Sequence, residues 1–191
     1  MRIGFDFDKV FIDYPPMLPY FIIDFLYKGT SVFKKSGMKA EELHYRYPGN
    51  MEQKIRVLSH HPTLRKPIKN NITFLKKISV KKNYQTFLIS SRFSFLKKRT
   101  EIILKKYKLD KCFDGIFFNF NDQQPHIFKE MTIKKLKIDA YVDDDLQLSL
   151  YLSKKMPDLS IYWVTNDTMN IKLPKNITPI KNLGHLEKYL P

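Results

Sequence analysis

The stretch Arg2-Ile3-Gly4-Phe5-Asp6-Phe7-Asp8-Lys9-Val10 decides the fold. Its apolar residues predict a buried strand over residues 2–7 that runs into two carboxylates, Asp6 and Asp8. Side chains two residues apart on an extended chain point to the same side, so both carboxylates could serve one site. Acidic residues beside an apolar strand can also cap the next helix, and the stretch therefore needs support from elsewhere in the chain.

Two further apolar runs end in polar residues. Residues 86–89 lead into Ser90-Ser91-Arg92, and residues 140–142 lead into Asp143-Asp144-Asp145. Strands and helices alternate along the chain, which predicts an α/β fold with a Rossmann-like parallel sheet flanked by helices on both faces. Ligands bind beyond the carboxyl ends of the strands in such sheets, and we expect all three polar clusters to meet there.

The remaining elements complete the alternation. Three more strands are predicted at 113–118, 159–164 and 177–180. Helices are predicted at 19–27, 40–45, 51–59, 71–78, 95–107, 128–136, 146–154 and 183–189. The pattern is mixed from Met17 to about Pro67, where turns at Pro48-Gly49-Asn50 and His61-Pro62 separate short helices.

Composition narrows the class of protein. A chain of 191 residues, 43% hydrophobic and 28% charged, is typical of one soluble domain that carries an insertion. No run approaches the roughly 20 apolar residues of a membrane helix, and the N-terminus lacks the pattern of a signal peptide. The single cysteine, Cys112, excludes an internal disulfide, so a reducing cytoplasm is the simplest compartment.

The net charge of +15 has two interpretations. It could mark attraction to nucleic acid or to other anionic ligands. It could also reflect a solvated surface, because lysine far outnumbers arginine and recurs in pairs such as Lys76-Lys77 and Lys105-Lys106. We favour the solvated surface, with a small phosphorylated substrate as the partner and nucleic acid as the alternative.

Carboxylates gathered in one crevice repel one another unless a cation lies between them. With oxygen ligands and no histidine or cysteine nearby in sequence, Mg²⁺ is the expected ion, and it is typical of phosphoryl-transfer sites. One carboxylate can then act as the nucleophile and a second as acid and base. A hydroxyl and an ammonium group can hold the phosphoryl oxygens.

The ordered set of motifs resembles the haloacid dehalogenase-like superfamily, most of whose members are phosphatases. The resemblance rests on residues 3–10, on Phe87-Leu88-Ile89-Ser90, on a lysine before the fourth strand and on Tyr141-Val142-Asp143-Asp144. It implies a Mg²⁺-dependent phosphoric monoester hydrolase with an aspartyl-phosphate intermediate and a nucleotidase-like or other small-molecule substrate. It also implies a core domain of residues 1–14 and 68–191 with a small helical cap of residues 15–67.

The resemblance also implies roles for individual residues. Asp6 would be the nucleophile, and Asp8 the general acid and base. The Mg²⁺ ligands would be Asp6, Asp8 through its backbone carbonyl, Asp143 and Asp144. The substrate-binding residues would be Ser90, Ser91, Arg92 and Lys129, with Lys134 or Lys135 in place of Lys129 as alternatives. Arg92 could instead pair with an acid or cap the next helix.

Lys9 departs from the family pattern, in which glycine or a small or polar residue usually follows the acid/base. Lys9 could reach the substrate or point into solvent, and it keeps a non-catalytic basic binding module open as an alternative. Phosphate removal from nucleic-acid ends is the other alternative. His60-His61 could bind metal or substrate, or lie in a surface turn.

Overall fold

The computed structural model describes residues 1–15, 43–166 and 171–190. Its strands are β1 (Arg2–Phe5), β2 (Gln85–Ser90), β3 (Gly115–Phe118), β4 (Ala140–Asp143), β5 (Ser160–Val164) and β6 (Ile177–Ile180). Its helices are α2 (Asn50–Ser59), α3 (Lys69–Ser79), α4 (Lys97–Lys106), α5 (Pro125–Leu136) and α6 (Leu146–Lys155), with 3-10 helices η2 (Ser94–Leu96) and η3 (Leu183–Lys188). None of the helices in these ranges is long and apolar enough to cross a membrane.

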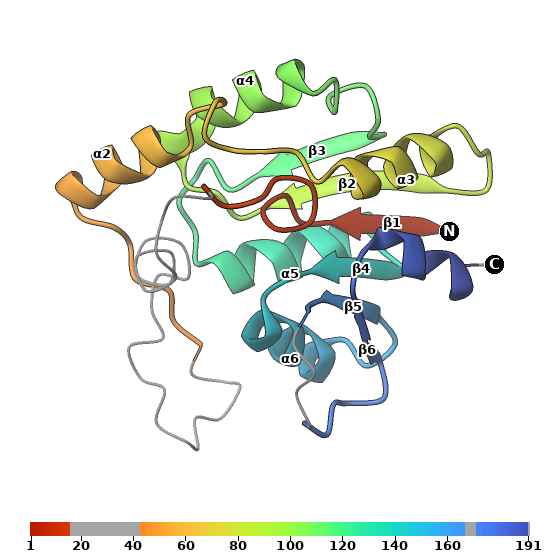
Figure 1. The fold of residues 1–191 in the computed structure, drawn as a ribbon. Helices are drawn as coiled ribbons and strands as arrows, with labels where there is room; N and C mark the ends of the chain where they lie inside the picture. The colour runs from red at the N-terminus through yellow and green to blue at the C-terminus, as the bar shows by residue number, and fades with distance from the viewer. Residues whose placement is uncertain (16–42, 167–170, 191) are drawn as a thin grey trace.

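Strand β1 lies in the interior of a six-stranded sheet with the order β3-β2-β1-β4-β5-β6. Every neighbouring pair is parallel, so all the strands end at the same edge of the sheet (Figure 1). The register places Phe5 opposite Leu88 of β2 and Val142 of β4. The predicted parallel α/β sheet is confirmed, and the polar residues that follow β1, β2 and β4 come together at one edge.

Helices cover both faces of the sheet. One face packs against α3 and α4 through a core that includes Leu75 and Ile103. The other packs against α5 and α6 through a core that includes Tyr141 and Leu148. Gly4 of β1 faces this second core, where an added Cβ would lie 2.9 Å from Cδ2 of Tyr141, so glycine leaves room for the Tyr141 ring.

Two predicted helices take a tighter form than expected. The segment predicted as one helix over 95–107 begins as the 3-10 turn η2 and continues as α4. The segment predicted as a terminal helix over 183–189 is the 3-10 helix η3. Short 3-10 turns are common at helix ends and in connections, and periodicity does not separate them from α-helix over so few residues.

The prediction of a helix over 40–45 is wrong over residues 43–45, which have no regular secondary structure. The backbone of Tyr45 instead bonds to the side chain of Gln124. Its N–H donates to Gln124 Oε1 at 2.9 Å, and its carbonyl accepts from Gln124 Nε2 at 3.1 Å. Residues 40–42 and the helix predicted over 19–27 lie outside the described residues.

Residues 43–67 are the described part of the predicted insertion, and they lie beyond the strand ends (Figure 1). The chain that follows α2 returns to the core and joins the loop after β1. The Asp13 N–H donates to the Lys66 carbonyl at 2.8 Å, and the Ile68 N–H donates to the Phe11 carbonyl at 2.8 Å. The end of the insertion is therefore bonded directly to the loop that carries Asp8.

Candidate active site

The end of β1 places Asp6 beside the end of β4. Because Phe5 pairs with Val142, the next residue of each strand, Asp6 and Asp143, lies at the same level. The Asp6 N–H donates to the Val142 carbonyl at 2.9 Å, which fixes this register beyond the strand. Asp6, Asp143 and Asp144 each offer one carboxylate oxygen, and these oxygens all lie within 4.8 Å of one another. We call these three residues the carboxylate cluster.

Lys129 of α5 lies between two members of the cluster. Its Nζ is 2.8 Å from Asp6 Oδ1 and 2.7 Å from Asp143 Oδ2, and its side chain is 3% exposed. Burial disfavours the charge on Lys129, but Asp143 and Asp6 outweigh it and raise the pKa of the ammonium group well above its ordinary value. The alternatives lie elsewhere: Lys134 pairs with Glu130 at 2.5 Å on the exposed side of α5, and Lys135 is exposed.

Burial governs the charge state of the cluster. It raises the pKa of Asp6 from 3.8 to about 7, with Asp143 and Asp8 adding to the rise and Lys129 opposing it. Burial together with the charges of Asp143 and Asp6 also raises the pKa of Asp144 well above its ordinary value. A single ammonium group thus does not fully compensate three carboxyl groups, and a divalent cation would complete the compensation.

Asp8 lies in a different electrostatic environment. Arg92 donates two hydrogen bonds to the Asp8 carboxylate, from Nε to Oδ2 at 2.8 Å and from Nη2 to Oδ1 at 2.7 Å. Arg65 also donates to Oδ1, and both guanidinium groups are buried. Burial by itself would raise the pKa of Asp8, but Arg92 and Arg65 outweigh it and hold this pKa well below its usual range.

These contacts show the acid with which Arg92 pairs, and contact between Arg92 and a substrate stays a prediction. Its guanidinium pairs with an acid, Asp8, and a third hydrogen bond runs from Nη1 to Thr100 Oγ1 at 2.9 Å. Among the described residues, the carboxylate cluster consists of Asp6, Asp143 and Asp144 and does not include the Asp8 carboxylate. The main-chain N–H of Asp8 donates to Asp6 Oδ2 at 3.1 Å, so the backbone of Asp8 still contacts the cluster.

Arg65 is the site residue that the sequence analysis did not find. It lies in the turn after α2, 57 residues from Asp8, and it is fully buried. No periodicity or motif marks an arginine in such a turn. Its neighbour His60 is also buried, its Nδ1 lies 2.7 Å from the Arg56 carbonyl, and burial lowers its pKa well below the ordinary value.

Ser90 and Ser91 reach the same edge of the sheet. Ser90 is the buried last residue of β2, two residues beyond Leu88, which pairs with Phe5. It therefore lies beside the chain that carries Asp6, and half-buried Ser91 follows it. Contact between these hydroxyl groups and a substrate stays a prediction.

The last residue of the acidic triplet, Asp145, caps a helix. Its Oδ1 accepts hydrogen bonds from the backbone N–H groups of Gln147 and Leu148 at 2.9 and 3.2 Å, at the start of α6. Its Oδ2 accepts a hydrogen bond from the Tyr45 hydroxyl at 2.7 Å. The beginning of the described part of the insertion is thereby attached to the loop that carries Asp143 and Asp144.

Lys9 points away from the cluster, toward Asp13. Its Nζ lies 2.6 Å from Asp13 Oδ1, and its side chain is 38% exposed. Its φ of 57° lies in the left-handed region that favours glycine. The lysine therefore adopts the backbone conformation that glycine would adopt more easily, and the loop after Asp8 keeps its sharp turn.

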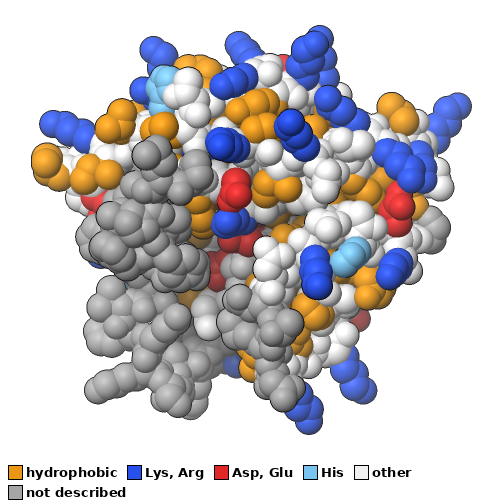
Figure 2. Space-filling view, viewed as in Figure 1, with side chains coloured by type: hydrophobic (Ala, Val, Ile, Leu, Met, Phe, Trp, Pro, Cys, Tyr) orange, Lys and Arg blue, Asp and Glu red, His pale blue; other side chains and the backbone are white. Residues whose placement is uncertain are grey.

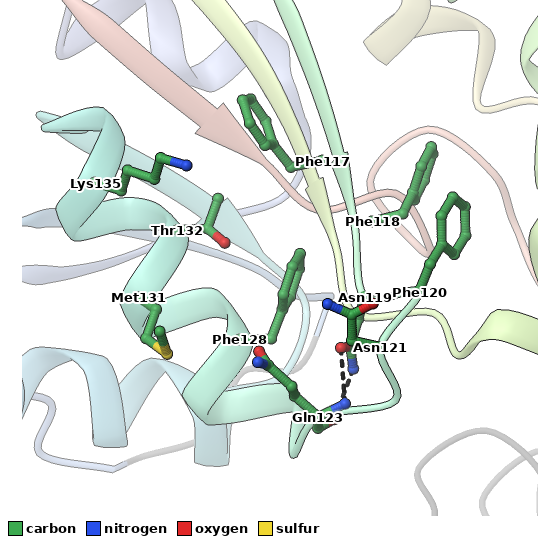
Figure 3. A pocket seen from close by; sticks show the side chains of 10 residues that line it. All are labelled: Phe117, Phe118, Asn119, Phe120, Asn121, Gln123, Phe128, Met131, Thr132 and Lys135. Carbon is green, nitrogen blue, oxygen red and sulfur yellow. Dashed lines mark hydrogen bonds between the residues drawn. The ribbon is translucent and has the colours of Figure 1, made fainter.

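A pocket of about 320 Å³ lies between the end of β3, the loop that follows and α5 (Figure 3). Four phenylalanines, Met131 and three amide side chains line it. Lys135 lines this pocket, which supports Lys129 over Lys135 as the lysine of the cluster. Figure 2 shows acidic side chains near the centre of one face, with lysine and arginine side chains spread around it.

Comparison with known proteins finds no protein-family profile and no curated protein that matches the sequence. Solved structures do match. A haloacid dehalogenase-like hydrolase from Bacteroides fragilis is 15% identical with a TM-score of 0.61, over 97% of this chain and 98% of that chain. A hydrolase of the same superfamily from Geobacter sulfurreducens is 14% identical with a TM-score of 0.59, over 99% and 98% of the two chains.

A third match, a haloacid dehalogenase-like family protein from Streptococcus pneumoniae, is 12% identical with a TM-score of 0.57, over 99% of this chain and 98% of that chain. Each match extends along nearly the full length of both chains. Because 15% of the residues or fewer are identical, the similarity is one of fold. The chain therefore has the fold of the haloacid dehalogenase-like hydrolases.

Proposed function

We propose that the protein is a hydrolase of this superfamily: a Mg²⁺-dependent phosphatase that acts on a small phosphomonoester through an aspartyl-phosphate on Asp6. The observation that carries the proposal is the buried arrangement of Lys129 between Asp6 and Asp143, with Asp144 within reach. A nucleotide is one candidate substrate.

The donor set fits Mg²⁺. The cluster offers only oxygen ligands, from Asp6, Asp143 and Asp144, and the Asp8 carbonyl is a further candidate. The ion would neutralise the charge of the phosphate as it approaches the Asp6 carboxylate. Lys129 and Ser90 would hold the phosphoryl oxygens by charge and by hydrogen bond.

The reaction has two steps in this proposal. In the first, an Asp6 carboxylate oxygen attacks phosphorus, and the bond from phosphorus to the leaving-group oxygen breaks. That oxygen keeps the electron pair and takes a proton from Asp8 acting as general acid. In the second, Asp8 removes a proton from water, the water oxygen attacks phosphorus, and the bond to Asp6 breaks to release inorganic phosphate. The ionised state of Asp8 suits the second step, because a base must begin without its proton.

The test is turnover of para-nitrophenyl phosphate, followed by a panel of metabolites and nucleotides, with and without Mg²⁺. Asp6→Asn should abolish turnover, because the amide is a poor nucleophile. The matched control is Asp158→Asn, which alters an exposed carboxylate outside the site and should leave turnover unchanged. Wild-type protein without turnover on the whole panel would refute the proposal and would favour a basic binding module.

The net charge of +15 supports a second candidate, phosphate removal from nucleic-acid ends. The lysine and arginine side chains around the acidic centre in Figure 2 would attract a phosphate backbone. Oligonucleotides with a 3′- or 5′-phosphate belong in the panel for this reason. A preference for them that falls steeply with salt would favour this candidate, whereas salt-insensitive turnover of nucleotides would favour a small substrate.

A further inference from the structure

The contacts of Asp8 point to a pair of residues outside the reacting groups. Both carboxylate oxygens of Asp8 accept hydrogen bonds from buried guanidinium groups. Arg92 binds in the two-pronged geometry that restricts a carboxylate most strongly. The Asp8 carboxylate is thereby held in one orientation, whereas a free aspartate at the mouth of a site could rotate between several.

Each arginine is itself held in place. The Arg92 guanidinium donates to Thr100 Oγ1 at 2.9 Å, and its Cζ lies 4.5 Å from the centre of the Phe7 ring. The Arg65 carbonyl accepts a hydrogen bond from the Tyr107 hydroxyl at 2.9 Å. The first arginine follows β2 and the second ends the insertion, so two separate segments of the chain converge on one carboxylate.

We infer that Arg92 and Arg65 are positioning residues that orient Asp8 as the base of the hydrolytic step. This inference rests on the proposed function. In that step the water oxygen forms a bond to phosphorus, and the bond from phosphorus to the Asp6 oxygen breaks. Asp6 keeps the electron pair, and the proton of the water passes to Asp8. With a leaving group that needs no proton, a rotated Asp8 leaves the first step intact and slows the second.

The experiment measures the covalent intermediate of Arg92→Ala with para-nitrophenyl phosphate and Mg²⁺. Nitrophenolate departs without a proton, so phosphorylation of Asp6 proceeds without help from Asp8. Acid quenching and intact-protein mass spectrometry report the phosphorylated fraction. The variant should lose about 10²-fold in kcat, in the range for a lost general base, while KM stays unchanged or falls and the phosphorylated fraction rises.

A double-mutant cycle separates positioning from a merely structural role. If Arg92 acts through Asp8, then Arg92→Ala should have little further effect on kcat in the Asp8→Asn background. Arg65→Ala should behave in the same way with a smaller loss, and Arg92→Lys should recover part of the activity because it keeps the charge. Arg99→Ala is the matched control, because this arginine of α4 lies outside the site and its loss should change nothing.

Three results would overturn the inference. One is a fall in kcat without accumulation of phosphorylated protein, although the variant remains folded by circular dichroism. Another is a rise in KM, which would indicate that Arg92 contacts the substrate. The third is an Arg92→Ala effect of full size in the Asp8→Asn background. Wild-type protein without turnover would instead refute the proposed function, and this inference with it.

Discussion

Replacement of Lys129 by methionine tests the electrostatic design of the site most directly. Methionine keeps most of the length of the side chain and removes the charge that lies 2.8 Å from Asp6 and 2.7 Å from Asp143. Removing one partner of a buried ion pair typically lowers the free energy of unfolding by about 3–5 kcal/mol. For a chain of 191 residues this corresponds to a fall of about 6–20 °C in the melting temperature.

The fall in the free energy of unfolding caused by Lys129→Met should depend on pH, and the Asp6 pKa gives the direction. The pKa of Asp6 is raised from 3.8 to about 7 in the folded protein, so the folded state binds this proton more tightly than the unfolded state. Stability is therefore lost as pH rises from about 4 through about 7. Without Lys129 the pKa of Asp6 rises further, so the variant continues to lose stability above about pH 7, where the wild type levels off, and the difference between the two proteins should grow there.

The assay is chemical denaturation of metal-free protein on either side of the Asp6 pKa. Lys134→Met is the matched control on the same helix, where an exposed pair with Glu130 should be worth only about 0.3–0.5 kcal/mol. Added Mg²⁺ should recover part of the lost stability, because the ion binds the folded state alone. If Lys129→Met proved as stable as Lys134→Met above the Asp6 pKa, Lys129 would not be the counterion of the cluster.

Three shorter predictions follow from the same structure. The affinity for Mg²⁺ should rise with pH up to the Asp6 pKa of about 7 and then level off, because Mg²⁺ binding displaces the proton of Asp6. Calorimetry in two buffers would detect the released proton. A pH-independent affinity would contradict this prediction. Lys9→Gly should raise the free energy of unfolding, measured in urea, by about 0–1 kcal/mol. Glycine relieves the left-handed backbone, but the exposed pair with Asp13 is lost. A clear loss of stability would show that the turn needs lysine. Gly4→Ala should lower the free energy of unfolding by about 1–3 kcal/mol because its Cβ would press on Tyr141, and an unchanged melting curve would show that the ring moves aside.

The sequence predicts the sheet and the position of the cluster because both follow from local patterns. An apolar run that ends in carboxylates defines a buried strand and its polar end, and the parallel-sheet rule then brings Asp6 and Asp143 to one edge. Lys129 is predicted from the family resemblance, which implies a lysine before the fourth strand. Its exposed neighbours Lys134 and Lys135 have the same local appearance, and only the packing of α5 separates them.

The partners of Asp8 and Tyr45 could not be predicted in this way. Arg65 reaches Asp8 across 57 residues, and Tyr45 bonds to Gln124 across 79 residues. Such pairs depend on where loops dock after the sheet has formed, and hydrogen bonds between loops leave no periodic signal in the sequence. The same docking overrides the helical pattern of residues 43–45, because tertiary hydrogen bonds outweigh weak local propensity.

Two carboxylates separated by one residue are brought into opposite electrostatic environments. Burial near Asp143 raises the pKa of Asp6, whereas Arg92 and Arg65 lower the pKa of Asp8. Titratable neighbours whose environments push their pKa values apart are the signature of divided acid and base roles. In the proposed function, this division suits Asp6 to the role of nucleophile and Asp8, whose pKa is lowered, to the role of base. The environment of Asp6 comes from α5 and β4, whereas that of Asp8 comes from the insertion and the loop after β2. Each carboxylate can therefore be perturbed without the other. The Lys129 and Arg92 variants should accordingly fail in different steps of the proposed reaction.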